Sequence, residues 1–251
     1  MTIKLWDGNT GNLSKTLSGQ GNEIFSLAVL PNGDLASGDN YGSIKIWNVN
    51  QSSIIRSISA TYTYIRSMKV LDNGYLASSS YGGTIKIWNT TDGSLIRTIN
   101  TNNQVYSMAV LKNGYIASGS SDRTIKIWNT ENGSLIFTLL GHTDNVESLL
   151  YLRNGLLVSG SNDNTIKIWN PNNGSLIMTL TGHGFWVGGL RELPNGNLAS
   201  GSADGTIKIW NTDTGALLQT LSGHYGGIGA LAVLENGYIA SASDQTIELW
   251  N

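Results

Sequence analysis

A tryptophan that closes a short alternation of apolar and polar residues recurs along the whole chain, and it restricts the possible folds more than any other feature. Consecutive copies are 40 or 41 residues apart. They are Trp6, Trp47, Trp88, Trp128, Trp169, Trp210 and Trp250. A fixed period of this length is the sequence signature of a repeat architecture, in which similar units bury their apolar faces against one another. We therefore expect a series of similar units.

Each repeat contains four segments with the pattern of β-strands. One repeat has an apolar first strand at 105–111, a second at 115–118, the tryptophan strand at 124–128 and a fourth at 134–139. An Asn-Gly pair follows each first strand, and this pair predicts a tight type I′ hairpin. Four antiparallel strands per unit of roughly 40–45 residues is typical of a propeller blade. The sequence therefore predicts an all-β fold, a β-propeller of four-stranded antiparallel blades.

Composition excludes several classes of function. The chain has 31 Gly, 3 Pro and no Cys, so a disulfide framework and thiolate zinc sites are excluded. A net charge of −2 provides no basic field for nucleic acid. No apolar run approaches the ~18 residues of a membrane span. The three histidines lie in different repeats, so we expect no metal and no cofactor. We predict an intracellular, cytoplasmic protein with no nucleic-acid or membrane partner.

The repeat also carries the dipeptides of a known family. Gly-His pairs, turn aspartates and one Trp-Asp pair recur at the same place in several repeats, whereas six tryptophans are followed by Asn. These residues are Gly141-His142, Gly182-His183, Gly223-His224, Asp122, Asp163, Asp204, Asp244 and Trp6-Asp7. The chain thus resembles the WD-repeat (WD40) β-propeller family over its whole length. The resemblance implies a single propeller domain at 1–251 whose N-terminal strand or strands join the C-terminal blade.

The number of blades follows from counting segments. Residues 13–17 would complete the blade that begins at Ile228, which favours six blades. That arrangement leaves one third strand in excess, because residues 2–6 and 246–250 compete for the same place. The alternative is an incomplete seven-bladed ring, either a fragment or a ring completed by a partner's strands. We expect a monomer unless the surplus strand pairs with another chain.

Three repeats contain a His, a Ser, an Asp and the Trp at matching positions. The sets are His142, Ser159, Asp163 and Trp169; His183, Ser200, Asp204 and Trp210; and His224, Ser241, Asp244 and Trp250. The family resemblance implies a structural network in which Asp and Ser tie the His to the indole N–H. A hydrolase would instead need an accessible Ser–His pair. The first three repeats lack the His, and Tyr41 and Gly82 replace the Asp in two of them, so we expect this half to be less rigid.

The repeats differ from one another mainly in two loops, one before each first strand and one between the second and third strands. In the family these loops share one rim, the top face. The variable positions are rich in residue types that anchor protein interfaces. They are Phe25, Tyr41, Tyr62, Tyr64, Arg66, Tyr81, Tyr106, Glu147, Phe185, Trp186 and Tyr225. We expect these residues to form a surface that binds a protein or peptide.

These features predict a non-catalytic scaffold or adaptor. One alternative is a targeting or regulatory propeller within a larger multidomain protein. A second, distant alternative is a hydrolase that uses one of the Ser/His/Asp sets. A third is a recent duplication or a design without a selected partner, which the close similarity of the repeats also fits.

Overall fold

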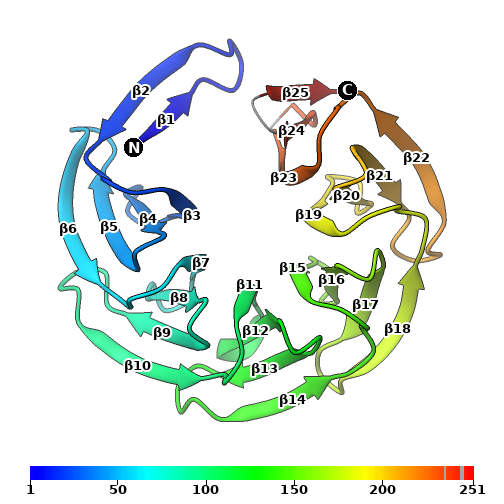
Figure 1. Ribbon diagram of the computed structural model, residues 1–251, viewed down its shortest axis with the longest axis horizontal. Coiled ribbons are helices and arrows are strands. Elements are labelled where there is room, and N and C mark those ends of the chain that lie inside the picture. The colour runs from blue at the N-terminus through cyan, green and yellow to red at the C-terminus, as the bar shows by residue number, and fades with distance from the viewer. Residues whose placement is uncertain (235, 244–245) are drawn as a thin grey trace. The chain divides into compact units, whose positions relative to one another are not determined.

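The computed structural model describes residues 1–234, 236–243 and 246–251. These residues contain 25 strands and one short helical segment, a 3-10 turn at Lys112–Gly114 (Figure 1). Five sheets have four strands in sequence order, one has three, and β1 and β2 form a separate two-stranded sheet. The five four-stranded sheets and the three-stranded sheet are the blades of a six-bladed β-propeller. The predicted all-β propeller with six blades is confirmed.

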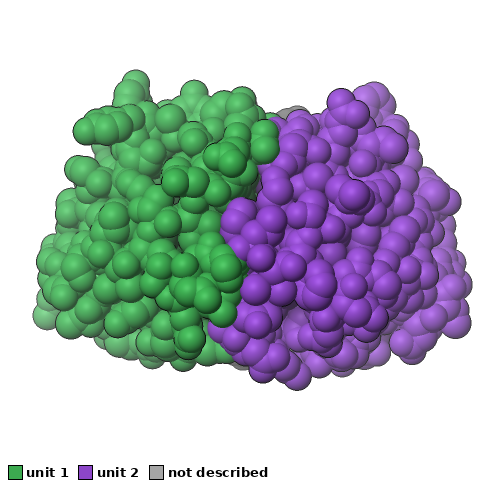
Figure 2. All heavy atoms as spheres, turned by 90° about the horizontal axis from the view of Figure 1, so that it is seen from below, with its two compact units in different colours: residues 1–110, 129–134 green, residues 111–128, 135–251 purple. Residues whose placement is uncertain are grey.

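The chain divides into two compact units (Figure 2). The first comprises residues 1–110 and 129–134, and it contains the β1–β2 sheet, the blades β3–β6 and β7–β10, and strand β11. Its strands are β1 Thr2–Trp6, β2 Leu13–Ser18, β3 Ile24–Val29, β4 Leu35–Asp39, β5 Ser43–Asn48, β6 Ser53–Ser59, β7 Ile65–Val70, β8 Leu76–Ser80, β9 Thr84–Trp88, β10 Leu95–Asn100 and β11 Val105–Val110.

The second unit comprises residues 111–128 and 135–251. It contains most of the blade β11–β14, the complete blades β15–β18 and β19–β22, and the three-stranded blade β23–β25. Its strands are β12 Tyr115–Ser120, β13 Ile125–Asn129, β14 Leu135–Leu139, β15 Val146–Tyr151, β16 Leu157–Ser161, β17 Ile166–Asn170, β18 Ser175–Leu180, β19 Val187–Glu192, β20 Leu198–Ser202, β21 Thr206–Trp210, β22 Leu217–Ser222, β23 Ile228–Val233, β24 Ile239–Ser243 and β25 Thr246–Trp250.

Alternation along the third strand places its apolar residues between blades. Residues two apart on a strand share a face, and Ile44 and Ile46 on β5 lie in one buried cluster with Ile65 and Met68 of β7. The same arrangement recurs in the second unit, where Ile207 and Ile209 lie with the apolar residues of β23 and β24. Within each of these two clusters, one blade therefore completes the core of the next.

The Asn-Gly hairpins form by a different turn from the one predicted. A type I′ turn needs positive φ at both central residues, but only Asn113 among these asparagines has positive φ. Elsewhere the glycine alone is left-handed, as at Gly33 with φ 84°. The amide of Gly33 donates to the carbonyl of Leu30 at 2.9 Å, and the amide of Leu30 donates to the carbonyl of Asp34 at 2.8 Å. This pattern is a type I turn followed by a glycine bulge.

The asparagine of each hairpin has a separate role. The Asn32 Oδ1 atom accepts the Asp34 amide at 3.1 Å, and Asn73, Asn154, Asn195 and Asn236 make the equivalent bond. A short amide side chain that bonds the backbone two residues later stabilises a turn without a second left-handed residue. Asn is therefore favoured here for its side chain rather than for its tolerance of positive φ.

The β1–β2 sheet repeats the pairing of a third strand with a fourth. Ile3 lies opposite Leu17, and Lys4 lies opposite Thr16. Leu17 is fully buried and belongs to one apolar cluster with Ile3 and Trp47. Residues 13–18 therefore already have a third strand as their partner in β1.

Candidate partner-binding site

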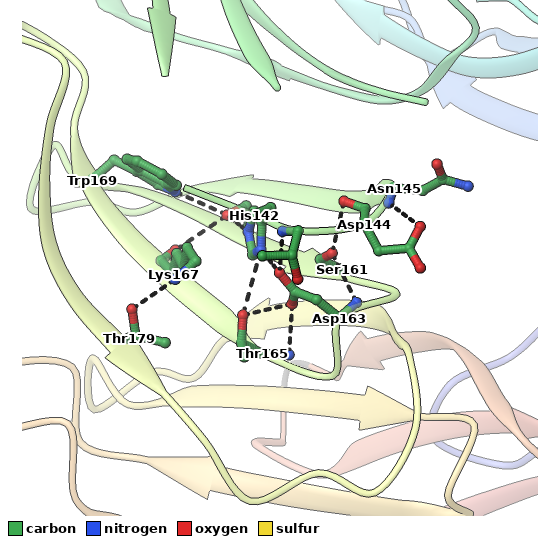
Figure 3. A network of polar contacts seen from close by, with 11 residues as sticks. His142, Asp144, Asn145, Ser161, Asp163, Thr165, Lys167, Trp169 and Thr179 are labelled. Carbon is green, nitrogen blue, oxygen red and sulfur yellow. Dashed lines mark hydrogen bonds and ion pairs between the residues drawn. The ribbon is translucent and has the colours of Figure 1, made fainter. Parts of the chain in front are cut away.

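The blade β15–β18 contains a continuous hydrogen-bond network (Figure 3). The indole Nε1–H of Trp169 donates to the Ser159 hydroxyl at 2.9 Å. The His142 ring bridges this hydroxyl to Asp163, with Nε2 2.7 Å from Ser159 Oγ and Nδ1 2.7 Å from Asp163 Oδ2. A neutral imidazole that carries its proton on Nδ1 satisfies both contacts, because it accepts from the serine and donates to the carboxylate.

The carboxylate at the end of this network is strongly favoured in its charged form. Burial alone would raise the pKa of Asp163, but hydrogen bonds from His142, from the Thr165 hydroxyl and from the Thr143 amide outweigh it. The pKa therefore lies far below the ordinary aspartate value. The network is fixed at both ends, by an indole donor and by a charged acceptor.

The blade β19–β22 repeats the arrangement. His183 contacts Ser200 Oγ at 2.8 Å and Asp204 Oδ2 at 2.9 Å, and Trp210 donates to Ser200 at 2.8 Å. Burial lowers the pKa of His183, although Asp204 opposes this effect. Burial alone would raise the pKa of Asp204, but hydrogen bonds from Thr206, from the Gly184 amide and from His183 lower it to about 2.

The third set is described in part. His224 Nε2 lies 2.6 Å from Ser241 Oγ, and Trp250 donates to the same oxygen at 2.7 Å. Asp244 lies outside the described residues. The His224 Nδ1 atom lies 3.7 Å from Glu248 Oε1 on β25.

The geometry of these sets differs from that of a hydrolase. Ser159 and Ser200 are fully buried, and each accepts the indole proton of its blade. A nucleophilic serine must reach its substrate beside an oxyanion-binding site. Both hydroxyls instead lie in the interior of their blades, as acceptors of the indole protons.

The first complete blade has a network that the sequence reasoning missed. Trp47 donates to Ser37 at 2.7 Å, Ser37 donates to Gln20 Oε1 at 2.6 Å, and Gln20 Nε2 donates to Asp39 Oδ2 at 3.0 Å. Gln20 and Asp39 are both buried. Asp39 lies two residues before Tyr41, the position that matches the turn aspartate in the other repeats. In this blade Gln20 and Asp39 thus take the place of the histidine and aspartate of the other networks.

In two further blades the tryptophan–serine bond is present without a histidine. Trp88 donates to Ser78 at 2.9 Å, and Trp128 donates to Ser118 at 2.9 Å. Thr61 and Thr101 lie four residues before their first strands, as His142 does. The Thr61 hydroxyl contacts Thr63, and the Thr101 hydroxyl donates to the Asn103 carbonyl, so both bonds stay within their own loops.

The predicted partner-binding residues of the first unit form a contiguous aromatic cluster, which we define as Phe25, Tyr64, Arg66, Tyr81 and Tyr106. The Phe25 and Tyr64 rings stack with centroids 5.6 Å apart. Tyr64 contacts Tyr81 at 5.7 Å, and Tyr81 contacts Tyr106 at 6.3 Å. The Arg66 guanidinium lies 5.7 Å from the Phe25 centroid and 5.5 Å from that of Tyr106. The four rings and the guanidinium therefore support one another.

The aromatic cluster has a structural origin in the repeat. Phe25, Arg66 and Tyr106 are the second residues of β3, β7 and β11, whereas Tyr64 precedes β7 and Tyr81 follows β8. Because neighbouring strands are antiparallel, the start of a first strand and the end of a second strand lie at the same end of a blade. Phe25, Tyr64 and Tyr81 are 43%, 44% and 40% exposed, so the cluster is anchored and accessible. Tyr41 and Tyr62, also in this unit, are more exposed.

The predicted residues of the second unit are arranged differently. Trp186 lies over Gly188, where an added Cβ atom would be 2.2 Å from Trp186 Cζ3. Gly188 occupies the strand position held by Arg66 and Tyr106, so its missing side chain makes room for the indole. Trp186 is 37% exposed. Phe185 and Tyr225 are largely exposed, and Glu147 on β15 is half-buried.

Repeated four-stranded blades with a buried tryptophan–serine bond define a repeat-type β-propeller. The chain belongs to the WD40 family, described as the WD domain, G-beta repeat. The family profile matches residues 11–48, 52–89, 93–129, 133–170, 174–211 and 215–251. Propellers of this family generally serve as protein-interaction scaffolds and are typically non-enzymatic.

One solved structure is similar to this chain in fold. The crystal structure of the computationally designed Ika8 protein is 31% identical, with a TM-score of 0.82 over 99% of this chain and 77% of that one. No curated protein sequence matches the chain. Among the described residues, no helix is both long enough and apolar enough to span a membrane.

Proposed function

We propose that this chain is a non-catalytic scaffold or adaptor that binds a protein or peptide through its top-face aromatic residues. The observation that carries the proposal is the aromatic cluster, in which four rings and one guanidinium are in continuous contact while Tyr64 and Tyr81 stay 44% and 40% exposed. Tyrosine and arginine are the residue types most enriched among the residues that dominate binding energy.

The cluster is suited to recognition because its side chains are already ordered. Stacking with Phe25 restricts the Tyr64 ring, and the Tyr106 hydroxyl donates to Gln104 at 2.8 Å. A ligand that covers these rings would lose little side-chain entropy on binding. Trp186, packed on Gly188 in the second unit, is a second preordered aromatic residue with the same property.

Peptide selection followed by titration tests the proposal. A displayed library of random peptides is panned against the folded chain, and the selected peptides are titrated against Tyr64→Ala/Tyr81→Ala. Loss of two anchoring rings should weaken binding by about 30-fold or more. Tyr238→Ala is the matched control, because Tyr238 is 41% exposed and follows an Asn-Gly hairpin at the other end of its blade.

Thermal unfolding and circular dichroism establish first that all variants are folded. Equal affinity of the selected peptides for the double variant and the parent chain would contradict the proposal. So would an equal loss of affinity in Tyr238→Ala.

A further inference from the structure

The last blade differs from its neighbours at one edge. Strand β25 pairs with β24 from Thr246 to Trp250, and no described pairing joins its other edge to a strand. In the complete blades of the same unit, that edge of the third strand pairs with a fourth strand. An unpaired edge presents a row of backbone donors and acceptors that can bind an additional strand.

The neighbouring blade gives the register that such a strand would adopt. Trp210 lies opposite Leu217, Ile207 opposite Leu221 and Lys208 opposite Thr220, with a bulge between Ile209 and Trp210. The blade β15–β18 has the same register and the same bulge. Both blades therefore place aliphatic residues opposite the tryptophan and opposite the first isoleucine of the third strand. On β25 these positions are Trp250 and Ile247.

A hollow of about 370 Å³ lies beside this edge, lined mainly by apolar residues such as Ile209, Leu221, Ile239 and Trp250. The preceding blade indicates what fills such a space. There, the loop before β22 places Gly215, with φ 75°, against Leu180 and Met178 of β18. Leu221 and Gln219 hold the positions of Leu180 and Met178 on β22, and both line the hollow. A left-handed glycine before the incoming strand would fit there.

Charge distinguishes this edge from the other third strands. The residue two positions before the repeat tryptophan is Glu248 in β25, whereas it is lysine in the other six third strands, at Lys4, Lys45, Lys86, Lys126, Lys167 and Lys208. In two complete blades this lysine bonds the residue directly opposite, as when Lys208 Nζ donates to Thr220 Oγ1 at 3.1 Å. The Glu248 side chain is 37% exposed. A cation opposite Glu248 would therefore form a cross-strand ion pair.

We propose that the β25 edge and the adjacent hollow bind an extended segment of a partner protein as a fourth strand. The segment has a left-handed glycine before the strand, aliphatic residues opposite Trp250 and Ile247, and Lys or Arg opposite Glu248. The chain's own segment of this pattern near the N-terminus, β2, pairs with β1 along its length. Because β2 is already paired in this way, the proposed occupant is a segment of a partner protein. This site is separate from the aromatic cluster, so the two proposals stand or fall independently.

Synthetic peptides supply the probe. The first peptide, called the lysine peptide, has the sequence of residues 211–222 with Thr220→Lys. In the register of β22 this substitution places the cation opposite Glu248. The matched controls are the same peptide with Thr220→Glu in place of lysine, and the lysine peptide with Gly215→Val. Binding to the full chain is measured by fluorescence anisotropy, and hydrogen exchange reports protection of the amides of residues 246–250.

The lysine peptide should bind and slow exchange along β25. The glutamate peptide should bind about tenfold more weakly, because like charges then face each other. Valine at the left-handed position should also weaken binding about tenfold. In Glu248→Lys, which restores the residue of the other third strands, the preference between the lysine and glutamate peptides should reverse.

Three results would overturn the proposal. The first is absence of binding by the lysine peptide at millimolar concentration. The second is a free chain in which the β25 amides are already as protected as those of β21, because a segment of the same chain would then occupy the edge. The third is binding that does not respond to Glu248→Lys.

Discussion

The blades β7–β10 and β19–β22 have the same strand order and the same tryptophan–serine bond, yet they differ in what lies behind the serine. In β19–β22 the hydroxyl continues through His183 to a charged Asp204. In β7–β10 the described contact of the Thr61 hydroxyl is with Thr63, in its own loop. The comparison separates two contributions. Every complete blade has the indole–serine bond, whereas the longer network adds buried bonds from that serine to a side chain of the preceding loop.

The blade β3–β6 clarifies what the addition requires. Gln20 accepts from Ser37 through Oε1 and donates to Asp39 through Nε2. A neutral imidazole protonated on Nδ1 has the same order of acceptor and donor. The network therefore needs a buried bridge of that polarity, and among the described residues both histidine and glutamine supply it.

The largest expected effect is the removal of a histidine bridge. His183→Ala should lower the free energy of unfolding by about 3 kcal/mol, because it leaves a cavity and removes partners from Ser200 and from a charged Asp204. Thr101→Ala, at the matching position of a blade without the bridge, should cost about 1 kcal/mol. Urea denaturation measures both. Equal losses would mean that the two kinds of blade do not differ energetically.

A smaller effect is expected from building the network where it is missing. Thr61→His/Gly82→Asp places a histidine and a carboxylate at the spacings of His142 and Asp163 from a serine already bonded to Trp88. The double variant should gain about 1 kcal/mol of unfolding free energy. Thr61→His alone is the control, since it lacks the charged acceptor. A double variant no more stable than this control would contradict the idea that the network adds stability to a blade that already has the indole–serine bond.

The exchange rates of the indole N–H protons with solvent should also differ between blades with and without a bridge. Trp169 and Trp210, and Trp47 through its glutamine bridge, should exchange about tenfold more slowly than Trp88 and Trp128, which corresponds to roughly one buried hydrogen bond. Nitrogen-15 spectra of the indole groups resolve the five signals. Uniform rates would contradict the hypothesis that the blades without a bridge are less rigid.

The smallest effect is a change in pH dependence. The unfolded chain protonates His183 below its ordinary pKa of 6.5, but the folded chain resists protonation because burial lowers that pKa. Stability is therefore full above pH 6.5 and falls as the pH decreases toward the lowered value. His183→Gln should cost less than about 1 kcal/mol at pH 7.5, by analogy with Gln20, and should flatten this part of the profile.

The lower part of the profile provides the control. Hydrogen bonds in the folded chain outweigh the effect of burial and lower the pKa of Asp204 from its ordinary 3.8 to about 2, so the contribution of this carboxylate to stability is lost as the pH falls below 3.8. That loss should persist in His183→Gln. Thermal unfolding midpoints from pH 8 to pH 2 test both parts, and an unchanged slope above pH 4 would rule out His183 as the titrating group.

The tryptophan period was sufficient to predict the propeller, because a spacing of 40 or 41 residues leaves few other ways to bury four strands. The glutamine bridge could not be predicted by comparing the repeats position by position. Its carboxylate, Asp39, lies two residues before the position of the turn aspartate in the other repeats. Gln20 occupies the histidine position, so in that comparison it was only the absence of a histidine. The signal was the pairing of two polar residues at buried positions of an otherwise matching repeat.

The aromatic residues show the same limit. The sequence was sufficient to predict their residue types and the loops that carry them. Their contacts depend on side-chain packing between neighbouring blades, which the sequence alone does not give. Arg66 lies between Phe25 and Tyr106 because all three occupy one strand position in successive repeats. Trp186 instead packs on Gly188. The one indication of this packing in the sequence was a glycine at the strand position that holds a large side chain in other repeats.

The hairpin geometry also bears on how the protein ages. In an Asn-Gly pair the glycine amide nitrogen can attack the carboxamide carbon of the asparagine side chain and release ammonia. Water then opens the resulting succinimide to aspartate or isoaspartate. In the hairpin after β3 the Gly33 amide is held by the Leu30 carbonyl, while the Asn32 side chain is held by the Asp34 amide. The attacking and receiving groups are thus engaged elsewhere in the folded chain. Chemical damage at these turns should therefore accumulate with the time that each blade spends unfolded.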